Sequence, residues 1–340
     1  MTAGFVELVG SIHVHTIKSD GVGDLKRVAR AAREASLDYV VVTDHDTKGY
    51  GLEHEACYVD GVLCLFGAEA TLPEGHFVVL GFPGELPHLD GMASYVRWAK
   101  EVGALGIVAH PHGGGNARVR VPGKPWRAGR LPDVGGIEAW SYMFDWTDAV
   151  RPLTTLKHML RPDDALSGPR PETLAWWDER AAEGPFPGIG ALDVHGLRTL
   201  PWRLFGLMSY ERLFPTLCTH LWTPPLTGDG REDAATLLDA LRIGRGFFAL
   251  DSLACSRGFV FKAGERLPGD NALLSKSLKL ALESPVEATW QLVKGGKVVG
   301  LAEGREAAFG LSGPGVYRVE GYVRGRPWLF TNHVRVVADD

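Results

Sequence analysis

The feature that most constrains this chain is its start, where His13 and His15 stand one residue apart at the end of an apolar stretch and Asp20 follows five residues later. In a β-strand alternate residues share a face, so the two imidazoles project together while Val14 faces the other way. Two imidazoles that converge on one point suit a divalent metal ion and make a poor piece of hydrophobic core. The start of the chain therefore predicts a metal site at the end of a first strand.

The size and composition of the chain indicate a globular protein with one large domain and a smaller one. Its 340 residues exceed the length at which a single core stops growing. The formal net charge of -5 gives no reason to expect nucleic acid as a partner, and no apolar run is long enough to span a membrane. The four cysteines form no CxxC pair and the start of the chain lacks a secretion pattern, so we expect reduced thiols and a cytoplasmic protein.

Residues 1–255 alternate between short apolar strands and amphipathic helices, which predicts a parallel α/β domain, either a barrel or an open sheet. The expected strands are Val6–Val14, Tyr39–Thr43, Val62–Ala68, His76–Phe82, Gly106–Ala109, Gly135–Trp140 and Ile189–Asp193. The expected helices are Asp24–Ser36, Met92–Val102, Pro171–Glu183 and Glu232–Ile243.

Residues 256–340 change to short alternating strands separated by turn residues, with Gly295-Gly296 as a hairpin signal. The expected strands are Leu278–Leu282, Glu287–Val293, Lys297–Leu301, Gly315–Val323 and Trp328–Val337. This pattern predicts a second domain over residues 256–340, a small antiparallel β-sandwich.

Histidines and carboxylates gather where the apolar strands of the first domain begin or end. Besides the first pair, they are Asp44, His45, Glu69, His76, His110, His112, Glu138, Asp193 and His195. In α/β barrels, polar residues at the carboxyl ends of the strands build the active site, so this placement favours a barrel with a site at one end. Beside Trp140 and Tyr142, Glu138 indicates a substrate wall more than a metal ligand.

The order of these blocks resembles the PHP (polymerase and histidinol phosphatase) superfamily. The matching blocks are His13-x-His15-x4-Asp20-Gly21, Thr43-Asp44-His45, Gly67-Ala-Glu69, His110-Pro111 and Asp193-x-His195. The resemblance implies a distorted (β/α)7 TIM-like barrel that holds two or three divalent metal ions, and ligands without thiolates suit Zn, Mn or Fe. It also implies a hydrolase in which a metal-bound hydroxide is the nucleophile.

Carried over by position, the resemblance implies three ligand sets and three further roles. His13, His15, Glu69 and Asp193 would hold one metal ion, and Glu69 would bridge to a second ion held by His76 and His110. Asp20, His45 and His195 would hold a third ion. His195 or His112 could protonate the leaving group. Asp44 would orient a ligand histidine by accepting a hydrogen bond from the ring N–H that does not face the metal ion.

The residues that would contact substrate lie in a basic loop and after the last block. Arg118, Arg120 and Arg127, with Arg198, form either an anion clamp or part of a solvated surface, and arginine suits phosphate because its fork binds two oxygens. The clamp predicts a small anionic ester as substrate and a phosphoesterase that cleaves a phosphate monoester or diester.

The later part of the chain leaves two other functions open. Glu232–Asp251 and Gly313–Glu320 resemble the CehA/McbA-type branch of PHP metallohydrolases, which implies a carbamate or aryl ester hydrolase with the same metal centre. Four aromatic residues favour that interpretation: Trp126, Trp140, Tyr142 and Trp146. The third alternative is a non-catalytic metal-binding interaction module. The sequence does not indicate an oligomeric state.

Overall fold

The computed structural model describes residues 4–47, 55–196 and 208–338, so the predicted contact of Arg198 lies outside the described residues. The elements of the first part are β1 (Val6–Val14), α1 (Leu25–Glu34), β2 (Tyr39–Val42), β3 (Cys57–Val59), β4 (Val62–Leu72), β5 (Gly75–Leu80), α2 (Met92–Glu101), β6 (Leu105–Val108), β7 (Gly136–Ser141), α3 (Tyr142–Ala149), α4 (Thr155–Leu160), the 3₁₀ turn η1 (Pro162–Ala165), α5 (Pro171–Glu183) and β8 (Gly188–Val194). The remaining elements are α7 (Tyr210–Leu213), β9 (Leu217–Thr223), α8 (Gly230–Ile243), β10 (Gly246–Leu250), β11 (Val260–Ala263), β12 (Asn271–Leu273), β13 (Lys279–Lys294), β14 (Lys297–Gly310), β15 (Gly315–Val323), β16 (Arg326–Thr331) and β17 (Val334–Val337).

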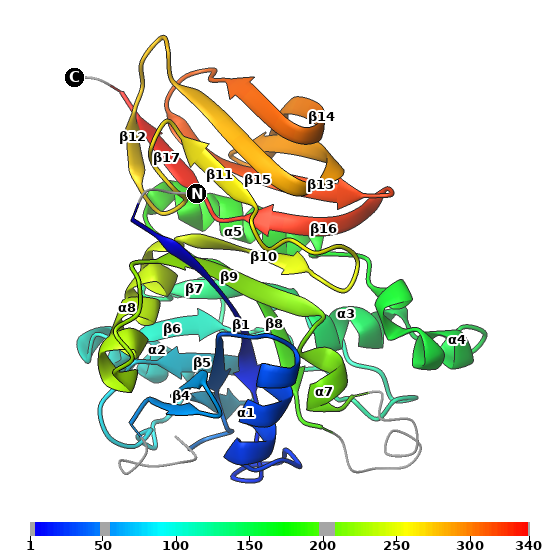
Figure 1. Ribbon diagram of the computed structural model, residues 1–340. Coiled ribbons are helices and arrows are strands. Elements are labelled where there is room, and N and C mark those ends of the chain that lie inside the picture. The colour runs from blue at the N-terminus through cyan, green and yellow to red at the C-terminus, as the bar shows by residue number, and fades with distance from the viewer. Residues whose placement is uncertain (1–3, 48–54, 197–207, 339–340) are drawn as a thin grey trace.

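Seven strands close into a barrel in the order β1, β2, β4, β5, β6, β7, β8 and back to β1 (Figure 1). The pairs are parallel except that β5 runs antiparallel to both of its neighbours. The predicted α/β barrel with a C-terminal β domain is confirmed. Strand β5 follows β4 through a tight turn, and such a connection can only make an antiparallel pair.

The barrel interior is filled by apolar side chains, with at least one from each of six strands. They belong to one buried cluster with Leu237 of α8: Ile12, Val41, Leu65, Val78, Ile107 and Ile189. Only the inside of a closed barrel brings single residues of so many strands together. Helix α1 packs on the outside, where Asp24 caps its start by accepting the N–H of Arg27.

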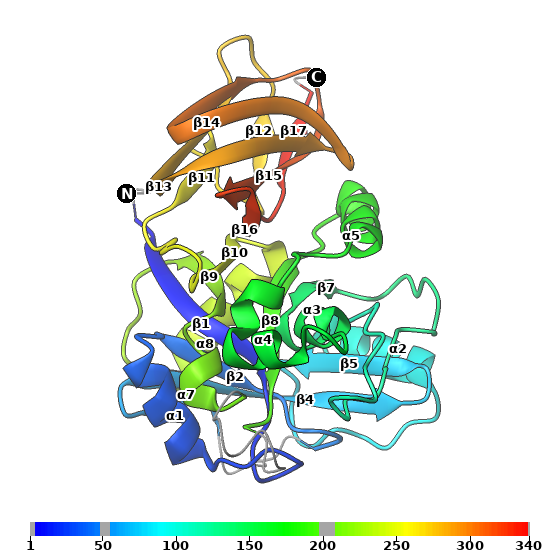
Figure 2. The ribbon, with the colours of Figure 1, turned by 90° about the vertical axis from the view of Figure 1, so that its right-hand side faces the viewer.

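The sheet does not end with the barrel. Strand β9 pairs with the first half of β1, β10 pairs with β9, and the other edge of β10 pairs with β16 of the C-terminal β domain. The strands β11–β17 stack beyond the end of the barrel at which β1 begins (Figures 1 and 2). Their pairing is antiparallel except for β12 and β17, which run parallel. The exact border between the two domains stays a prediction.

A buried ion pair joins the C-terminal β domain to α5. Arg318 donates from Nε and Nη2 to the two carboxylate oxygens of Asp178, at 2.7 and 2.9 Å, and from Nη1 to Glu320. His333 contacts the same carboxylate at 2.7 Å. Burial would raise the pKa of Asp178, but Arg318 and His333 lower it to about 2, so this carboxylate stays ionised. Within the described residues, no helix is long and apolar enough to cross a membrane.

We predict that Arg318→Met lowers the free energy of unfolding by about 3–5 kcal/mol, because Asp178 and Glu320 would remain buried without their cation. Equilibrium unfolding in urea, followed by tryptophan fluorescence, measures this change. Arg326→Met is the matched control, because Arg326 is partly exposed and its pair with Asp164 spans 3.8 Å. A control that costs as much as Arg318→Met would contradict the special role of the buried pair.

Candidate metal centre

The predicted ligands occupy the layer of the barrel directly above its apolar interior. His45, Glu69 and Asp193 each follow an inward-facing apolar residue by four positions, namely Val41, Leu65 and Ile189. A period of two accounts for the inward direction of His45 and Glu69. Asp193 also faces the site, but its backbone is left-handed, with φ of 53°, so regular alternation does not account for it. On the antiparallel β5, His76 precedes the inward-facing Val78 by two positions and reaches the same layer.

Two ligand candidates need a break in this alternation. Ile12 and Ala109 face the interior, so His13 and His110 would turn outward in a regular strand. Both residues instead adopt a left-handed backbone, with φ of 69° for His13 and 29° for His110, and the register of β1 shifts between Ile12 and Val14. Such bulges re-aim side chains at barrel rims, and a residue held in this region costs about 1–3 kcal/mol.

The first strand therefore reaches the predicted arrangement by a different route. His13 and His15 do share a face, and Val14 does pack on the other side in the outer core. Regular alternation, however, would have left Ile12 and His13 on opposite faces, whereas both face inward. The sequence prediction was right about the pair and wrong about the regular strand that carries it.

Glu69 lies at the centre of the histidines. Its carboxylate is within 3.0 to 3.4 Å of ring nitrogens of His13, His15, His45 and His110, and it makes a 2.7 Å hydrogen bond with Nδ1 of His76. The side chain has no solvent exposure. A buried carboxylate of this kind is stable only beside positive charge or strong donors.

Among the described residues, three overlapping groups could hold a metal ion, and the donor atoms within each group lie within 4.8 Å of one another. They are His13, His15 and Asp193; His45, Glu69 and His76; and His15, Asp20, His45 and His195. The family resemblance implies that His45 shares an ion with Asp20 and His195. In the structure His45 lies in that group and also in the group of Glu69 and His76. His110 stands outside these groups, and its Nε2 lies 3.4 Å from Glu69.

The donor atoms fit a metal ion because many of them are buried without a hydrogen-bond partner. Among the described residues these are His13 Nε2, both ring nitrogens of His15, His76 Nε2, His110 Nδ1 and Glu69 Oε2. Buried polar atoms in folded proteins are nearly always paired, so a cluster of unpaired ones indicates a missing partner. Imidazole nitrogens and carboxylate oxygens of this kind suit Zn, Mn or Fe.

The carboxylates of the site are held ionised by their surroundings. Burial would raise the pKa of Glu69 and of Asp193, but the neighbouring histidines, His13 first among them, hold both well below their usual values. Burial lowers the pKa of His13, yet the carboxylates of Glu69, Glu138 and Asp193 outweigh it and raise the pKa well above its usual value. The site therefore stabilises positive charge, as a cation site must.

The outer edge of the site is formed by Asp20 and His195. Burial would raise the pKa of Asp20, but His195, 3.2 Å away, lowers it to about 2, and burial of His195 is outweighed by Asp20 and Asp193, which raise its pKa to about 9. The loop that carries Asp20 turns tightly, because a Cβ on Gly21 would lie 2.5 Å from the carbonyl oxygen of His15. Tyr210 fixes this loop by donating to the same oxygen at 2.7 Å.

Glu138, which the sequence analysis placed in a substrate wall, contacts two of the ligand candidates. Its Oε1 makes a short hydrogen bond with Nδ1 of His13, and its Oε2 accepts the backbone N–H of His110 at 2.7 Å. One carboxylate thus holds the two histidines whose backbones are left-handed. With Nδ1 bonded to Glu138, His13 directs Nε2 toward Glu69 and Asp193.

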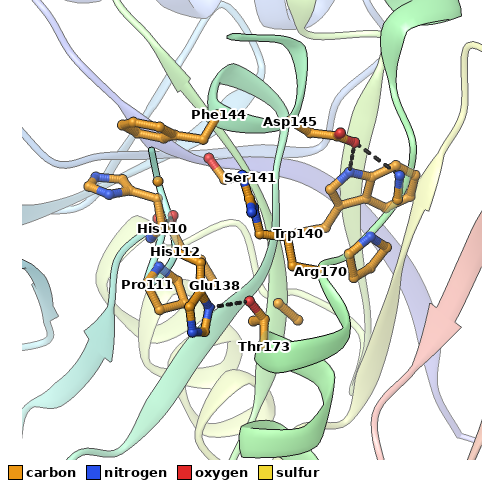
Figure 3. Close-up of a pocket in the computed structure, with 14 residues that line it drawn as sticks. His110, Pro111, His112, Glu138, Trp140, Ser141, Phe144, Asp145, Arg170 and Thr173 are labelled. Atoms are coloured by element: carbon orange, nitrogen blue, oxygen red, sulfur yellow. Dashed lines mark hydrogen bonds between the residues drawn. The ribbon is translucent and has the colours of Figure 1, made fainter. Parts of the chain in front are cut away.

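The structure places Asp44 and His112 beside the cluster of ligand candidates, and their predicted roles stay predictions. Asp44 accepts hydrogen bonds from the backbone and hydroxyl of Thr16 and from the hydroxyl of Ser19, so within the described residues its hydrogen bonds close the loop after β1. His112 makes a 2.7 Å hydrogen bond with Thr173 and lines a separate small pocket of about 30 Å³ (Figure 3). Asp44 ends up outside because it lies one residue away from the inward-facing His45.

A cleft of about 350 Å³ opens beside the metal-ligand candidates. Of the predicted substrate contacts, Arg120 lines it, together with Lys124 from the same loop. Arg118 and Arg127 are exposed and are not among the residues that line this cleft. The basic loop therefore brings two of its cations to the site.

Comparisons with known proteins give limited likenesses. No family model matches the chain. The uncharacterized protein MJ1587 of Methanocaldococcus jannaschii is 26% identical over 113 residues, which span 30% of this chain and 66% of that protein.

Two solved structures are similar in part. A two-domain protein from Bacteroides vulgatus "containing predicted PHP-like metal-dependent phosphoesterase" has a TM-score of 0.48 at 16% identity, over 98% of this chain and 96% of the other. A protein from Bifidobacterium adolescentis, whose name also assigns it by prediction to metal-dependent phosphoesterases, has a TM-score of 0.34 at 16% identity, over 55% and 87%.

We predict that Glu69→Ala removes most of the bound metal, because Glu69 contacts histidines from both sides of the site. Asp20→Ala should lose at most one ion, since the Asp20 side chain is 58% exposed and belongs to one candidate group. Elemental analysis of protein reconstituted with Zn²⁺ or Mn²⁺ measures the number of ions. Equal metal content in wild type and Glu69→Ala would refute the central position of this carboxylate.

We predict that Glu138→Gln weakens metal binding by about 10–100-fold, because partners that orient a ligand histidine have effects of this size. Competition with a chromogenic chelator, with Zn²⁺ as the probe, measures the affinity. Glu7→Gln is the matched control, since Glu7 contacts the buried His220 at 2.7 Å far from the site. An affinity that falls equally in both variants would point to general destabilisation instead.

Proposed function

We propose that the chain is a metal-dependent hydrolase of the PHP superfamily that cleaves a small phosphate ester. The observation that supports this most is the cleft itself, in which the candidate metal ligands His76, His110 and Asp193 face Arg120 and Lys124. A phosphoryl group placed there would meet cations on both sides. Zn, Mn or Fe are the ions whose ligand preferences the site meets, and a cytoplasmic location stays a prediction.

The mechanism assigns one task to each set of residues. Bound divalent ions would supply an ionised water at neutral pH and would neutralise charge on the phosphoryl group. Arg120 and Lys124 bind the ester and orient it toward the ligand layer. His195, raised to a pKa of about 9 by its acidic neighbours and 15% exposed at the cleft, holds a proton that it can give to the leaving group.

The role of His195 depends on how many ions bind. If two ions were held by the more buried ligands, His195 and Asp20 would remain an ion pair at the mouth of the site, with the proton on His195. With a third ion, the same two residues and His45 become ligands, and leaving-group protonation falls to solvent. The metal count from reconstitution decides between these states.

The four aromatic residues that favoured the carbamate or aryl ester alternative do not lie in the cleft. Trp140, Tyr142 and Trp146 are buried, and neither they nor Trp126 line the cleft with the metal ligands. A neutral carbamate would also leave Arg120 and Lys124 without an anionic partner. A non-catalytic metal-binding module would need no cations beside its metal ligands, so Arg120 and Lys124 favour an enzyme.

We predict that Arg120→Ala and Lys124→Ala each raise KM for p-nitrophenyl phosphate at least several-fold in the Mn²⁺- or Zn²⁺-loaded protein, because a charged hydrogen bond contributes about 1.5–3 kcal/mol. Arg118→Ala is the matched control from the same loop and should leave KM unchanged. A matched screen with an aryl carbamate accompanies it. Cleavage of the carbamate without cleavage of any phosphate ester would overturn the proposal.

A further inference from the structure

The cleft beside the metal centre has two chemically different walls. One wall carries the ligand candidates, among them His76, His110 and His195. The other wall consists of the loop segment from Arg120 to Lys124 and the first turn of α3. A volume of about 350 Å³ lies at the small end of the range for small-molecule sites, so the cleft fits a compact ligand.

The second wall is held in a fixed position by Asn116. The backbone N–H of Asn116 donates to the carbonyl of Val121 at 2.8 Å, and its side-chain amide donates to the carbonyls of Thr147 and Val150 at 3.0 and 2.9 Å. The loop and the end of α3 are thus tied together. A wall that is formed before the ligand arrives loses little conformational entropy on binding.

Four side chains give this wall an apolar surface: Val121, Pro122, Met143 and Phe144. The ring centroid of Phe144 lies 4.3 Å from that of His110, so the apolar surface starts directly beside a ligand candidate (Figure 3). Val121 is half-buried and Pro122 is exposed, which leaves apolar area that a ligand can cover. Phosphate alone has no group that would use this surface.

The cations stand on either side of the apolar pair in the loop, in the order Arg120, Val121, Pro122, Gly123, Lys124. An anion that contacts Arg120, Lys124 and the ligand layer therefore has its ester substituent against Val121 and Pro122. Two protein cations beyond the metal ions favour an anion with two negative charges over one with a single charge.

We propose that the cleft selects a phosphate monoester with a compact apolar substituent, and that Val121, Pro122, Met143 and Phe144 form the subsite for that substituent. The proposal rests on the proposed function, because it names the substrate class of the same site. The subsite selects among esters by the apolar area of the substituent. The cations select among them by the charge of the phosphate group.

Phenylphosphonate and methylphosphonate test the subsite without turnover, because both carry the same dianionic head group and neither has an ester bond to break. Calorimetric titration of the Zn²⁺-loaded protein should show at least about 10-fold tighter binding of phenylphosphonate, since the phenyl ring buries more apolar area. Val121→Ser and Phe144→Leu should reduce this ratio. Lys124→Ala should weaken both ligands and leave the ratio unchanged.

Two outcomes separate the subsite from the function on which it depends. Equal affinity of the two phosphonates for wild type, with cleavage of phosphate esters, overturns the subsite and leaves the proposed function standing. No binding of either phosphonate and no cleavage of any phosphate ester overturns both. Phe144 is buried, at 6% exposed, so Phe144→Leu could disturb folding. Val121 is only half-buried, so Val121→Ser still tests the subsite if Phe144→Leu fails to fold.

Discussion

A carboxylate without solvent exposure, Glu69, is the constraint on which the upper end of the barrel depends. An isolated buried carboxylate costs several kcal/mol, and histidines from β1, from β5 and from the ends of β2 and β6 offset this cost. These strands lie on different sides of the ring. The charge on Glu69 is therefore compensated only when β1 and β2 on one side of β4 and β5 and β6 on the other are in place.

The same layer also contains backbone strain, and a second carboxylate limits it. His13 and His110 occupy left-handed conformations that regular strands avoid. Glu138 bonds to the ring of one and to the backbone of the other, so these two positions are supported from a single strand, β7, while a third left-handed ligand candidate, Asp193, lies on β8. Strain at ligand positions and a shared buried support are what a pre-organised site requires.

Much of this arrangement could be predicted from the sequence because it follows from periodicity. Alternation places His45 and Glu69 inside once the apolar residues four positions earlier are recognised. The Gly295-Gly296 hairpin follows equally directly, with Lys294 facing Lys297. What could not be predicted depends on contacts between distant segments. The bond from Glu138 to His13 spans 125 residues, and no local pattern distinguishes it from a strand-end acid in a substrate wall.

The other differences have similar causes. Asp44 looked like a partner for a histidine because it adjoins His45, yet its neighbour in space is the loop of Thr16 and Ser19. Strands β9 and β10 were not among the expected strands. β10 is a short apolar run without alternation, and β9 mixes apolar residues with Thr219, His220 and Thr223, so neither shows a period of two.

The position of β10 has a mechanical consequence. Both of its edges are hydrogen-bonded, one to β9 and the other to β16, and β9 is bonded in turn to β1. A force on the C-terminal strands would thus be transmitted through the hydrogen bonds of β16, β10 and β9 to β1. The far end of β1 carries His13 and leads to His15. This continuous set of backbone hydrogen bonds joins the barrel to the C-terminal β domain. A hinge motion between the two parts would have to break some of these hydrogen bonds.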